Sequence, residues 1–283
     1  MSANRSIFGR AGWVGRAALL VPSVIALSVA GVAPAAAEIL FPAPLHITRE
    51  LTDPISGSKS VIDEYCHGNR VVSVNGRRTA IAEYDKNVLT TIDFDAGTYS
   101  VTKFEDLARV YEKNVGASVK ASAAEWRVET LGGRVVASRP GEEIEAERKD
   151  AHGGQLVRIT ADRQLTVSRA ALEVLMGTAW PRRSDASSDV LVGALRSKER
   201  RAVATGAAAG AAQNEYHLPL EHVTRFEIEG ETVETRNVVL RIGSELPPPD
   251  VLAVPPGARL VESEAIVARR MLEELDGAPA PKP

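Results

Sequence analysis

Short turn signals recur about every ten residues between His46 and Phe104, and this spacing constrains the fold more than any other feature of the chain. The signals are pairs of small or polar residues, namely Gly57-Ser58, Gly68-Asn69, Asn75-Gly76, Lys86-Asn87 and Ala96-Gly97. Strand-length segments between such turns are typical of an antiparallel meander. Asn75-Gly76 predicts a tight hairpin, because both residue types tolerate positive φ.

One strand and one helix are especially clear in this region. From 88 to 95 the residues alternate between two faces, with one face carrying Val88, Thr90, Ile92 and Phe94 and the other Leu89, Thr91, Asp93 and Asp95. After Thr102, apolar residues recur at helical spacing at Phe104, Leu107, Ala108 and Tyr111. Acidic residues follow the expected helix start, and Gly116 is placed to end it. We expect this helix to pack on the sheet face that carries Ile92 and Phe94.

The rest of the chain predicts more strands, two short helices and a strap. Strands are expected at 126–131 and 134–138, joined by Gly132-Gly133, then at 156–167, and in a closing pair at 218–228 and 232–242. Ser168 is expected to cap one helix, and Ser187 or Ser188 another. The proline-rich segment 247–256 favours an extended strap, because proline cannot donate to a ladder. We interpret 182–214 as a helical and Ala-rich insertion or lid on one domain spanning 38–263, followed by a C-terminal helix and disordered tail at 264–283.

Residues 1–37 have the pattern of a secretory signal peptide. Three arginines precede an apolar run from Ala17 to Val32, and Ala35-Ala36-Ala37 supplies the small residues that signal peptidase accepts. The alternative is a membrane anchor, since the run approaches the length that spans a bilayer. We expect cleavage after Ala37 and a periplasmic or extracellular location, with no further transmembrane helix.

Charge and cysteine content narrow the class of protein. The 34 basic and 37 acidic residues become 31 and 37 without the signal peptide, a mildly acidic balance that argues against nucleic acid as a partner. Cys66 is the only cysteine, so an exported fold must hold together through its core, without an internal disulfide.

No catalytic signature is present, and we expect a non-enzymatic protein without catalytic residues, cofactor or metal. The chain lacks a Gly-x-Ser-x-Gly elbow, a phosphate loop, a His-Glu-x-x-His pair and paired Cys-x-x-Cys motifs. Cys66 and His67 are adjacent on a strand, so they point to opposite faces.

Three groups of polar residues are candidates for binding a cation, a metal or a partner. Asp93 and Asp95, joined by Asp63 or Asp85, suit either an oxygen-rich cation site or a solvated sheet face. His217 and His222 lie on opposite faces of a regular strand, which disfavours a metal site. The basic run from Arg196 to Arg201 suits either contact with anionic lipid or a partner, or a solvated helix end.

A curved antiparallel sheet with helices on its concave face can enclose an apolar cavity or close on a dry core. The expected fold is therefore α+β, a strongly curved, unclosed β-barrel with helices on that face. If the cavity exists, its expected lining consists of Val88, Ile92, Phe94, Phe104, Leu107, Tyr111, Phe226 and Ile228.

The segment from Val61 to Leu107 resembles an uncharacterised family of secreted bacterial domains, related in fold to the lipoprotein-sorting carriers LolA and LolB. The resemblance rests on the motifs at 65–71, 80–85, 89–93 and 98–107. It implies a half-barrel around helices, with a cavity that in the carriers holds lipoprotein acyl chains. The insertion at 182–214 and the strap at 247–256 depart from those carriers.

These features predict an exported half-barrel that binds a lipid, an acyl chain, a lipoprotein or another apolar ligand between sheet and helices. The alternative is a structural or interaction module of the cell envelope, with a closed core and a protein partner that contacts the strap or an edge strand.

Overall fold

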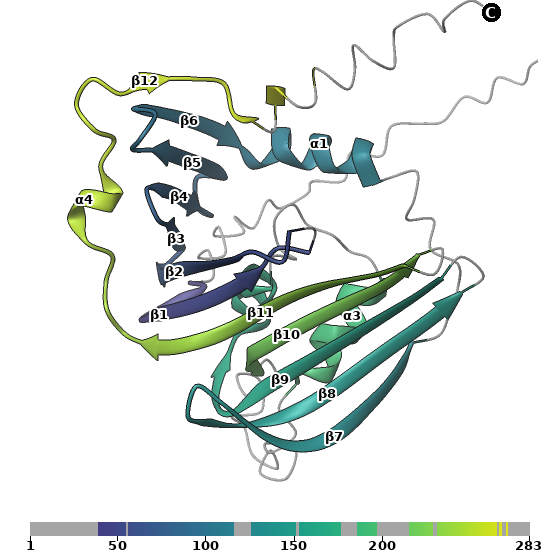
Figure 1. The fold of residues 1–283 in the computed structure, drawn as a ribbon. Coiled ribbons are helices and arrows are strands. Elements are labelled where there is room, and N and C mark those ends of the chain that lie inside the picture. The colour runs from purple at the N-terminus through teal and green to yellow at the C-terminus, as the bar shows by residue number, and fades with distance from the viewer. Residues whose placement is uncertain are drawn as a thin grey trace, which may run out of the picture. The chain divides into compact units, whose positions relative to one another are not determined.

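The computed structural model describes residues 39–54, 56–115, 126–150, 153–176, 186–196, 215–228, 231–264, 266–267 and 270. They form one twelve-stranded sheet in the order β12-β6-β5-β4-β3-β2-β1-β11-β10-β9-β8-β7 (Figure 1). All neighbours are antiparallel except β12 and β6. Within the described residues the two end strands do not pair, so the predicted large antiparallel sheet that does not close into a barrel is confirmed.

The strands are β1 Phe41–Thr52, β2 Lys59–Gly68, β3 Arg70–Asn75, β4 Arg78–Glu83, β5 Val88–Asp93, β6 Thr98–Lys103, β7 Arg127–Val136, β8 Arg139–Asp150, β9 Gly153–Val167, β10 Tyr216–Ile228, β11 Glu231–Gly243 and β12 Arg259–Leu260. The helices are α1 Phe104–Val115, α2 Arg169–Leu175, α3 Ala186–Ala194 and α4 Pro249–Leu252.

The local signals of the first meander give the expected elements. β3 and β4 form a hairpin in which Gly76 has a φ of 57°, a conformation that glycine adopts without strain. β5 and α1 occupy the predicted segments. At α2, the Ser168 side chain accepts a hydrogen bond from the Ala171 backbone N–H at 3.2 Å, which is the predicted cap.

The prediction of a turn at Gly132-Gly133 is wrong. β7 continues through both glycines, with Leu131 as the extra residue of a bulge and Gly132 at a φ of 136°. The chain instead turns at Ala137 and Ser138, which both have positive φ and lead into β8. β8 has no counterpart among the predicted strands.

The helices α2 and α3 pack on one face of the sheet, which we call the helix-side face. The central cluster joins β1, β2, β3, β10, β11 and the end of β7 to α2 and consists of Phe41, Ile47, Cys66, Val71, Val136, Ala171, Leu175, Leu218, Leu220 and Val239. The helix cluster joins β8 to β10 to both helices and consists of Ile144, Ala146, Val157, Ile159, Ala161, Leu172, Leu191, Val192, Leu195 and Tyr216. Three core residues from α3 and its end thus lie inside the segment predicted as a lid, so this part belongs to the core.

The opposite face carries a third group, the strap cluster, which consists of Val72, Ile81 and Ile92. Val251 and Leu252 of α4 pack against it, so part of the proline-rich segment lies over β3, β4 and β5 as a short helix. β12 then continues beside β6 (Figure 1). The C-terminal helix beyond Arg270 and most of the Ala-rich segment lie outside the described residues.

The predicted position of α1 is wrong. Ile92 lies in the strap cluster, whereas Leu107 of α1 lines a cavity with Leu89 and Thr91, which point to the other face of β5. The apolar side of Ile92 is already covered by α4, and α1 therefore covers the face that carries hydroxyl groups. The helical spacing predicts that α1 has an apolar stripe, but it contains no information on which sheet face receives that stripe.

Leu172→Ala should lower the free energy of unfolding by about 2–5 kcal/mol, because Leu172 is fully buried between the sheet and α3 and its truncation leaves a cavity. Urea unfolding followed by circular dichroism measures this. Val101→Ala, at a side chain that is 53% exposed, is the control and should change stability by less than about 0.5 kcal/mol. A small effect of Leu172→Ala would contradict the described packing of α2.

Candidate binding surface on the helix-side face

The sheet separates the eight residues that the sequence assigns to an apolar cavity. Ile92 and Phe94 belong to or pack against the strap cluster, and Val88 points to the same face as Ile92. Leu107 lies on the helix-side face, and Phe104 of α1 contacts Tyr84 with ring centroids 5.4 Å apart. Phe226 pairs with Gln155 and thus shares the helix-side face with Val157. The side chains of Tyr111 and Ile228 lie outside the described part of the chain.

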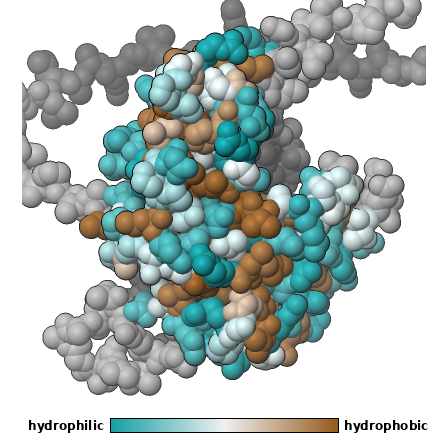
Figure 2. Space-filling view, turned by 60° about the vertical axis from the view of Figure 1, so that its left-hand side comes forward, coloured by the Kyte–Doolittle hydropathy of each residue, from teal (hydrophilic) through white to brown (hydrophobic). Residues whose placement is uncertain are grey.

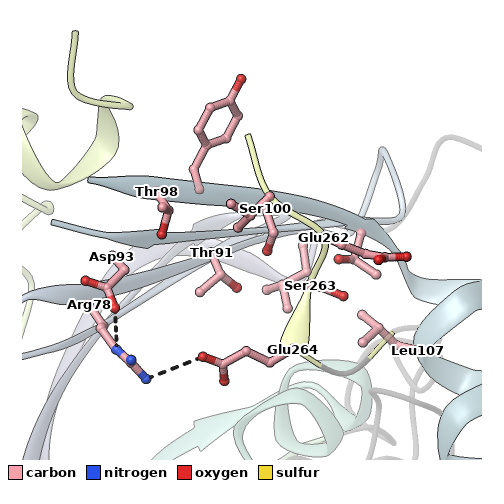
Figure 3. Close-up of a pocket in the computed structure, with 13 residues that line it drawn as sticks. Arg78, Thr91, Asp93, Thr98, Ser100, Leu107, Glu262, Ser263 and Glu264 are labelled. Carbon is pink, nitrogen blue, oxygen red and sulfur yellow. Dashed lines mark hydrogen bonds and ion pairs between the residues drawn. The ribbon is translucent and has the colours of Figure 1, made fainter. Parts of the chain in front are cut away.

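The cavity beside α1 is small and has a mixed lining of apolar, hydroxyl and charged groups. It has a volume of about 170 Å³ and lies between β5, β6, α1 and residues 261–264. Figure 3 shows hydroxyl side chains lining it, and Arg78 lies between Asp93 and Glu264. Arg78 Nε is 2.9 Å from Asp93 Oδ2, and its Nη1 is 3.9 Å from Glu264 Oε1. The charged and hydroxyl groups of the cavity suit a few waters or a small polar molecule.

A polar strip crosses the helix-side face where β2, β1, β11 and β10 lie side by side. We call it the inner polar strip, and it consists of Glu64, Arg49, Asn237 and His222. Arg49 is only 3% exposed and pairs with Glu64, with 2.6 Å between Nε and Oε2. Val239, directly opposite Arg49, and Cys66, on the same strand as Glu64, both belong to the central cluster. Charged and apolar groups are therefore adjacent on this face.

Two buried atoms of the inner polar strip have no hydrogen-bond partner among the described residues. They are Nη2 of Arg49 and Oδ1 of Asn237, one donor and one acceptor. A buried polar atom without a partner costs roughly 1–3 kcal/mol, and more for a charged group. The strip therefore has one donor and one acceptor that stay unpaired within the described residues.

Electrostatics on the strip favour an anionic or neutral ligand group over a cationic one. Burial, and then the positive charge of Arg49, lower the pKa of His222, so its imidazole is neutral at neutral pH. The imidazole Nε2 lies 3.1 Å from Thr224 Oγ1. Arg49 is then the buried cation of the strip, and Glu64 neutralises it from one side only.

Cys66 is unsuited to nucleophilic chemistry. Its thiol is buried in the central cluster, and that burial, aided by the charge of Glu64, raises its pKa far above the usual range. Burial also raises the pKa of Tyr84, with smaller contributions from Cys66 and Glu64. His67 is exposed next to Cys66, as their adjacent positions on one strand predict.

The opposite face carries a separate ionic cluster around His46, which is 4% exposed. Its Nε2 lies 2.9 Å from Asp63 Oδ1, and its Nδ1 lies 3.1 Å from Glu245 Oε2. Arg241 lies 3.1 Å from Glu245, and Tyr65 stacks on the imidazole with centroids 4.1 Å apart. Glu245 lies just before the proline-rich segment 247–256, so this cluster connects the entry to the strap with β1 and β2.

Among the residues that the structure describes, three of the four aspartates considered for a cation site, all but Asp85, have protein partners. Asp93 pairs with Arg78 and accepts a hydrogen bond from the Ala96 backbone N–H at 2.8 Å, while Asp95 pairs with Arg77. Asp63 lies in the His46 cluster instead. No group of three metal-ligating residues is placed to hold a metal within the described ranges. Most of the basic run, from 197 to 201, lies outside those ranges.

No helix within the described ranges is both long and apolar enough to cross a membrane.

The inner polar strip was not predicted from the sequence. Arg49, Glu64, His222 and Asn237 come from four strands, and Leu240, the extra residue of β11 between the partners of Thr48 and Arg49, sets which face Asn237 occupies. The usable signal was a charged residue inside an otherwise apolar strand pattern, since such a residue is almost never fully buried unless it is paired.

Comparisons with known proteins find no matching family model and no matching curated protein. Among solved structures, the chain is similar to PNGF-II, with 10% identity, 82% of this chain covered and a TM-score of 0.35. It is also similar to the Pseudomonas aeruginosa MucA/MucB complex, with 12% identity, 77% covered and a TM-score of 0.32. A third is a putative outer membrane lipoprotein-sorting protein domain from Vibrio parahaemolyticus, with 7% identity, 74% of this chain and 89% of that chain covered, and a TM-score of 0.27.

This chain spans 33% of the PNGF-II chain and 58% of the matched chain of the MucA/MucB complex. At these TM-scores, no inference about function rests on the similarities.

Asp63→Asn should weaken the fold at neutral pH and lose its effect in acid. Burial raises the pKa of the Asp63 carboxyl, but hydrogen bonds from Thr48 and His46, with the charges of His46 and Arg241, bring it below its ordinary value of 3.8. A pKa lowered by folding adds stability above the ordinary value, and this stability is lost as the pH falls through the folded-state value.

We expect a loss of roughly 0.5–1 kcal/mol at neutral pH, a modest value because Asp63 is 38% exposed. Urea unfolding of both proteins should converge as the pH falls below the folded-state pKa of Asp63, where its carboxyl is protonated in the folded and the unfolded state alike. Asp95→Asn, in the surface pair with Arg77, is the control and should leave the free energy of unfolding unchanged at every pH. A constant difference for Asp63→Asn across pH would contradict the ionic role.

Proposed function

We propose that this chain is a non-enzymatic, exported binding protein that holds an amphipathic ligand, such as a lipid or the acyl chain of a lipoprotein, between the sheet and its helices. We propose further that the sheet is a curved half-barrel whose concave side is the helix-side face. One observation carries the proposal. The guanidinium of Arg49 is buried beside the central cluster, and its Nη2 has no hydrogen-bond partner among the described residues.

The helix-side face offers both kinds of surface that an amphipathic ligand needs. The central cluster supplies apolar contacts for a hydrocarbon chain, and Phe104, Leu107 and Phe226 extend that surface. Arg49 Nη2 can donate to a carboxylate, phosphate or ester oxygen, and Asn237 Oδ1 can accept from a hydroxyl or amide. Ligand pockets commonly combine an apolar lining with a few placed polar groups.

Native mass spectrometry with lipid extraction, on the chain purified from an exporting host, tests the proposal. We expect a co-purified amphipathic lipid at one molecule per chain. A lipid-free mass, together with no binding of a dansylated fatty acid, would overturn the proposal.

The double variant Arg49→Met, Glu64→Gln should weaken binding of a dansylated fatty acid by about tenfold or more. A hydrogen bond to a charged group contributes about 1.5–3 kcal/mol, and 1.4 kcal/mol corresponds to a factor of ten. Both partners are replaced together so that no buried charge is left unpaired. Fluorescence titration measures the affinity, and circular dichroism verifies folding.

The matched control is Arg225→Met, Glu234→Gln, which removes an ion pair of 2.8 Å between β10 and β11 that is largely exposed. It should bind the probe like the unchanged protein. Equal loss in both double variants would mean that charge in general, not Arg49, governs binding.

A second candidate function is an envelope interaction module that binds a protein through the strap. The observation that favours it is a set of exposed apolar residues on or near the strap, namely Leu246, Val254, Leu260 and Val261. In Figure 2, hydrophobic residues form a broken band among hydrophilic ones on the side that is turned forward. A lipid-free protein that captures one envelope protein, with capture lost in Leu246→Ser, Leu260→Ser, would favour this function over the first.

A further inference from the structure

We propose that β7 is a self-complementary edge through which two copies of this chain join their sheets around a two-fold axis. The proposal rests on the placement of charged and apolar residues along β7, and it is independent of the proposed ligand.

The two edges of the sheet differ in whether another strand covers them. β6 is covered by β12, which the chain places beside it in parallel (Figure 1). β7 pairs only with β8 among the strands that the structure describes, and its residues are exposed from Arg127 to Val135. An exposed edge presents unpaired backbone N–H and C=O groups, which favours pairing with another strand.

The exposed apolar side chains of β7 need a cover. Val128, Leu131 and Val135 are 43%, 47% and 69% exposed, respectively. Val128 lies opposite Ala146, a member of the helix cluster, and therefore points to the helix-side face. After the bulge at Leu131, Val135 points to the same face, because its neighbour Arg134 reaches Glu143 and Glu221 on the opposite one.

The charges of β7 are arranged so that an antiparallel copy complements them. If Val128 lies opposite Val135 of the second copy, then Glu129 lies opposite Arg134, and the symmetry repeats each pair. Glu129 shares the face of Arg134, because it lies opposite Glu145, whose ion pair with Arg158 is on that face. In this register, residues that lie opposite each other share one face of the joined sheet. Valine is then opposite valine and glutamate is opposite arginine, and both kinds of pair stabilise adjacent strands. The two Leu131 residues flank the two-fold axis.

Other registers lose this match. A shift by one residue places residues of different faces opposite each other along the strand. A shift by two residues in one direction places Arg127 opposite Arg134, and like charges directly opposite are destabilising. A shift by two in the other direction places Glu129 opposite Val136 and leaves no charge pair. Charges on an edge usually prevent pairing, but here they select one partner and one register.

The first test is sedimentation equilibrium of the chain purified from an exporting host, over a series of concentrations. We expect the mass to double from one chain to two as the concentration rises. Glu129→Lys should abolish the dimer, because the introduced ammonium group would face Arg134 of the second copy. Glu129→Lys, Arg134→Glu should restore it by exchanging the charges.

Glu105→Lys on α1, an exposed charge reversal away from the edge, is the control and should leave the dimer unchanged. A monomer at every concentration, or a dimer indifferent to Glu129→Lys, would overturn the proposal.

Because Arg134 also pairs with the buried Glu221, the charge-exchange variant can fail for lack of stability. Cross-linking supplies a measurement without that risk. The variant Val128→Cys, Val135→Cys should form, on mild oxidation, a covalent dimer in which position 128 of one copy is linked to position 135 of the other. Peptide mapping that finds 128 linked to 128, or no linked dimer, would contradict the register.

Discussion

The attachment of α2 to the helix-side face is the contact on which both apolar clusters of that face depend. Ala171 and Leu175 pack into the central cluster, while Leu172, between them on the same short helix, packs into the helix cluster. A helix of seven residues has little stability of its own, so packing and the Ser168 cap hold it. Because α2 contacts β10 and α3 and has residues in both clusters, it links α3 to the sheet.

That attachment explains why polar groups on the same face are costly. Arg49 would lose little free energy on an open sheet surface, where water would solvate all of its donors. Next to the central cluster it is 3% exposed, and one of its terminal nitrogens has no partner in the described part of the chain. An apolar residue of similar volume would stabilise the core more than Arg49 does. The fold can retain this destabilising residue where the residue serves a binding function. The opposite face also carries exposed pairs, such as Arg225 with Glu234, which cost little and contribute little, beside the buried His46 and Glu221.

The sequence predicts local structure well here and long-range placement poorly, for identifiable reasons. β5, α1 and the Ser168 cap depend on residues within one turn or strand, and each was predicted correctly. β8 was missed because its acidic residues outnumber its apolar ones. Long-range contacts, such as the pairing of Glu145 with Arg158 and the burial of Ile144 and Ala146 in the helix cluster, make such a strand favourable. The His46 cluster joins residues 199 positions apart, and no spacing rule reaches that far. The inner polar strip depends on a bulge in β11 at Leu240, which no local pattern indicates.

The two ends of the sheet show how one constraint can have two solutions. At β6 the chain uses its own proline-rich segment, with α4 over the strap cluster and β12 on the edge, so that prolines lie where no ladder hydrogen bond is needed. At β7 a glycine-containing bulge interrupts the ladder, which limits pairing with arbitrary strands. A bulge at the centre of the strand is nevertheless compatible with a second copy, because two-fold symmetry places one bulge against the other. The same feature that excludes most partners therefore leaves one partner whose pattern of charges and valines fits.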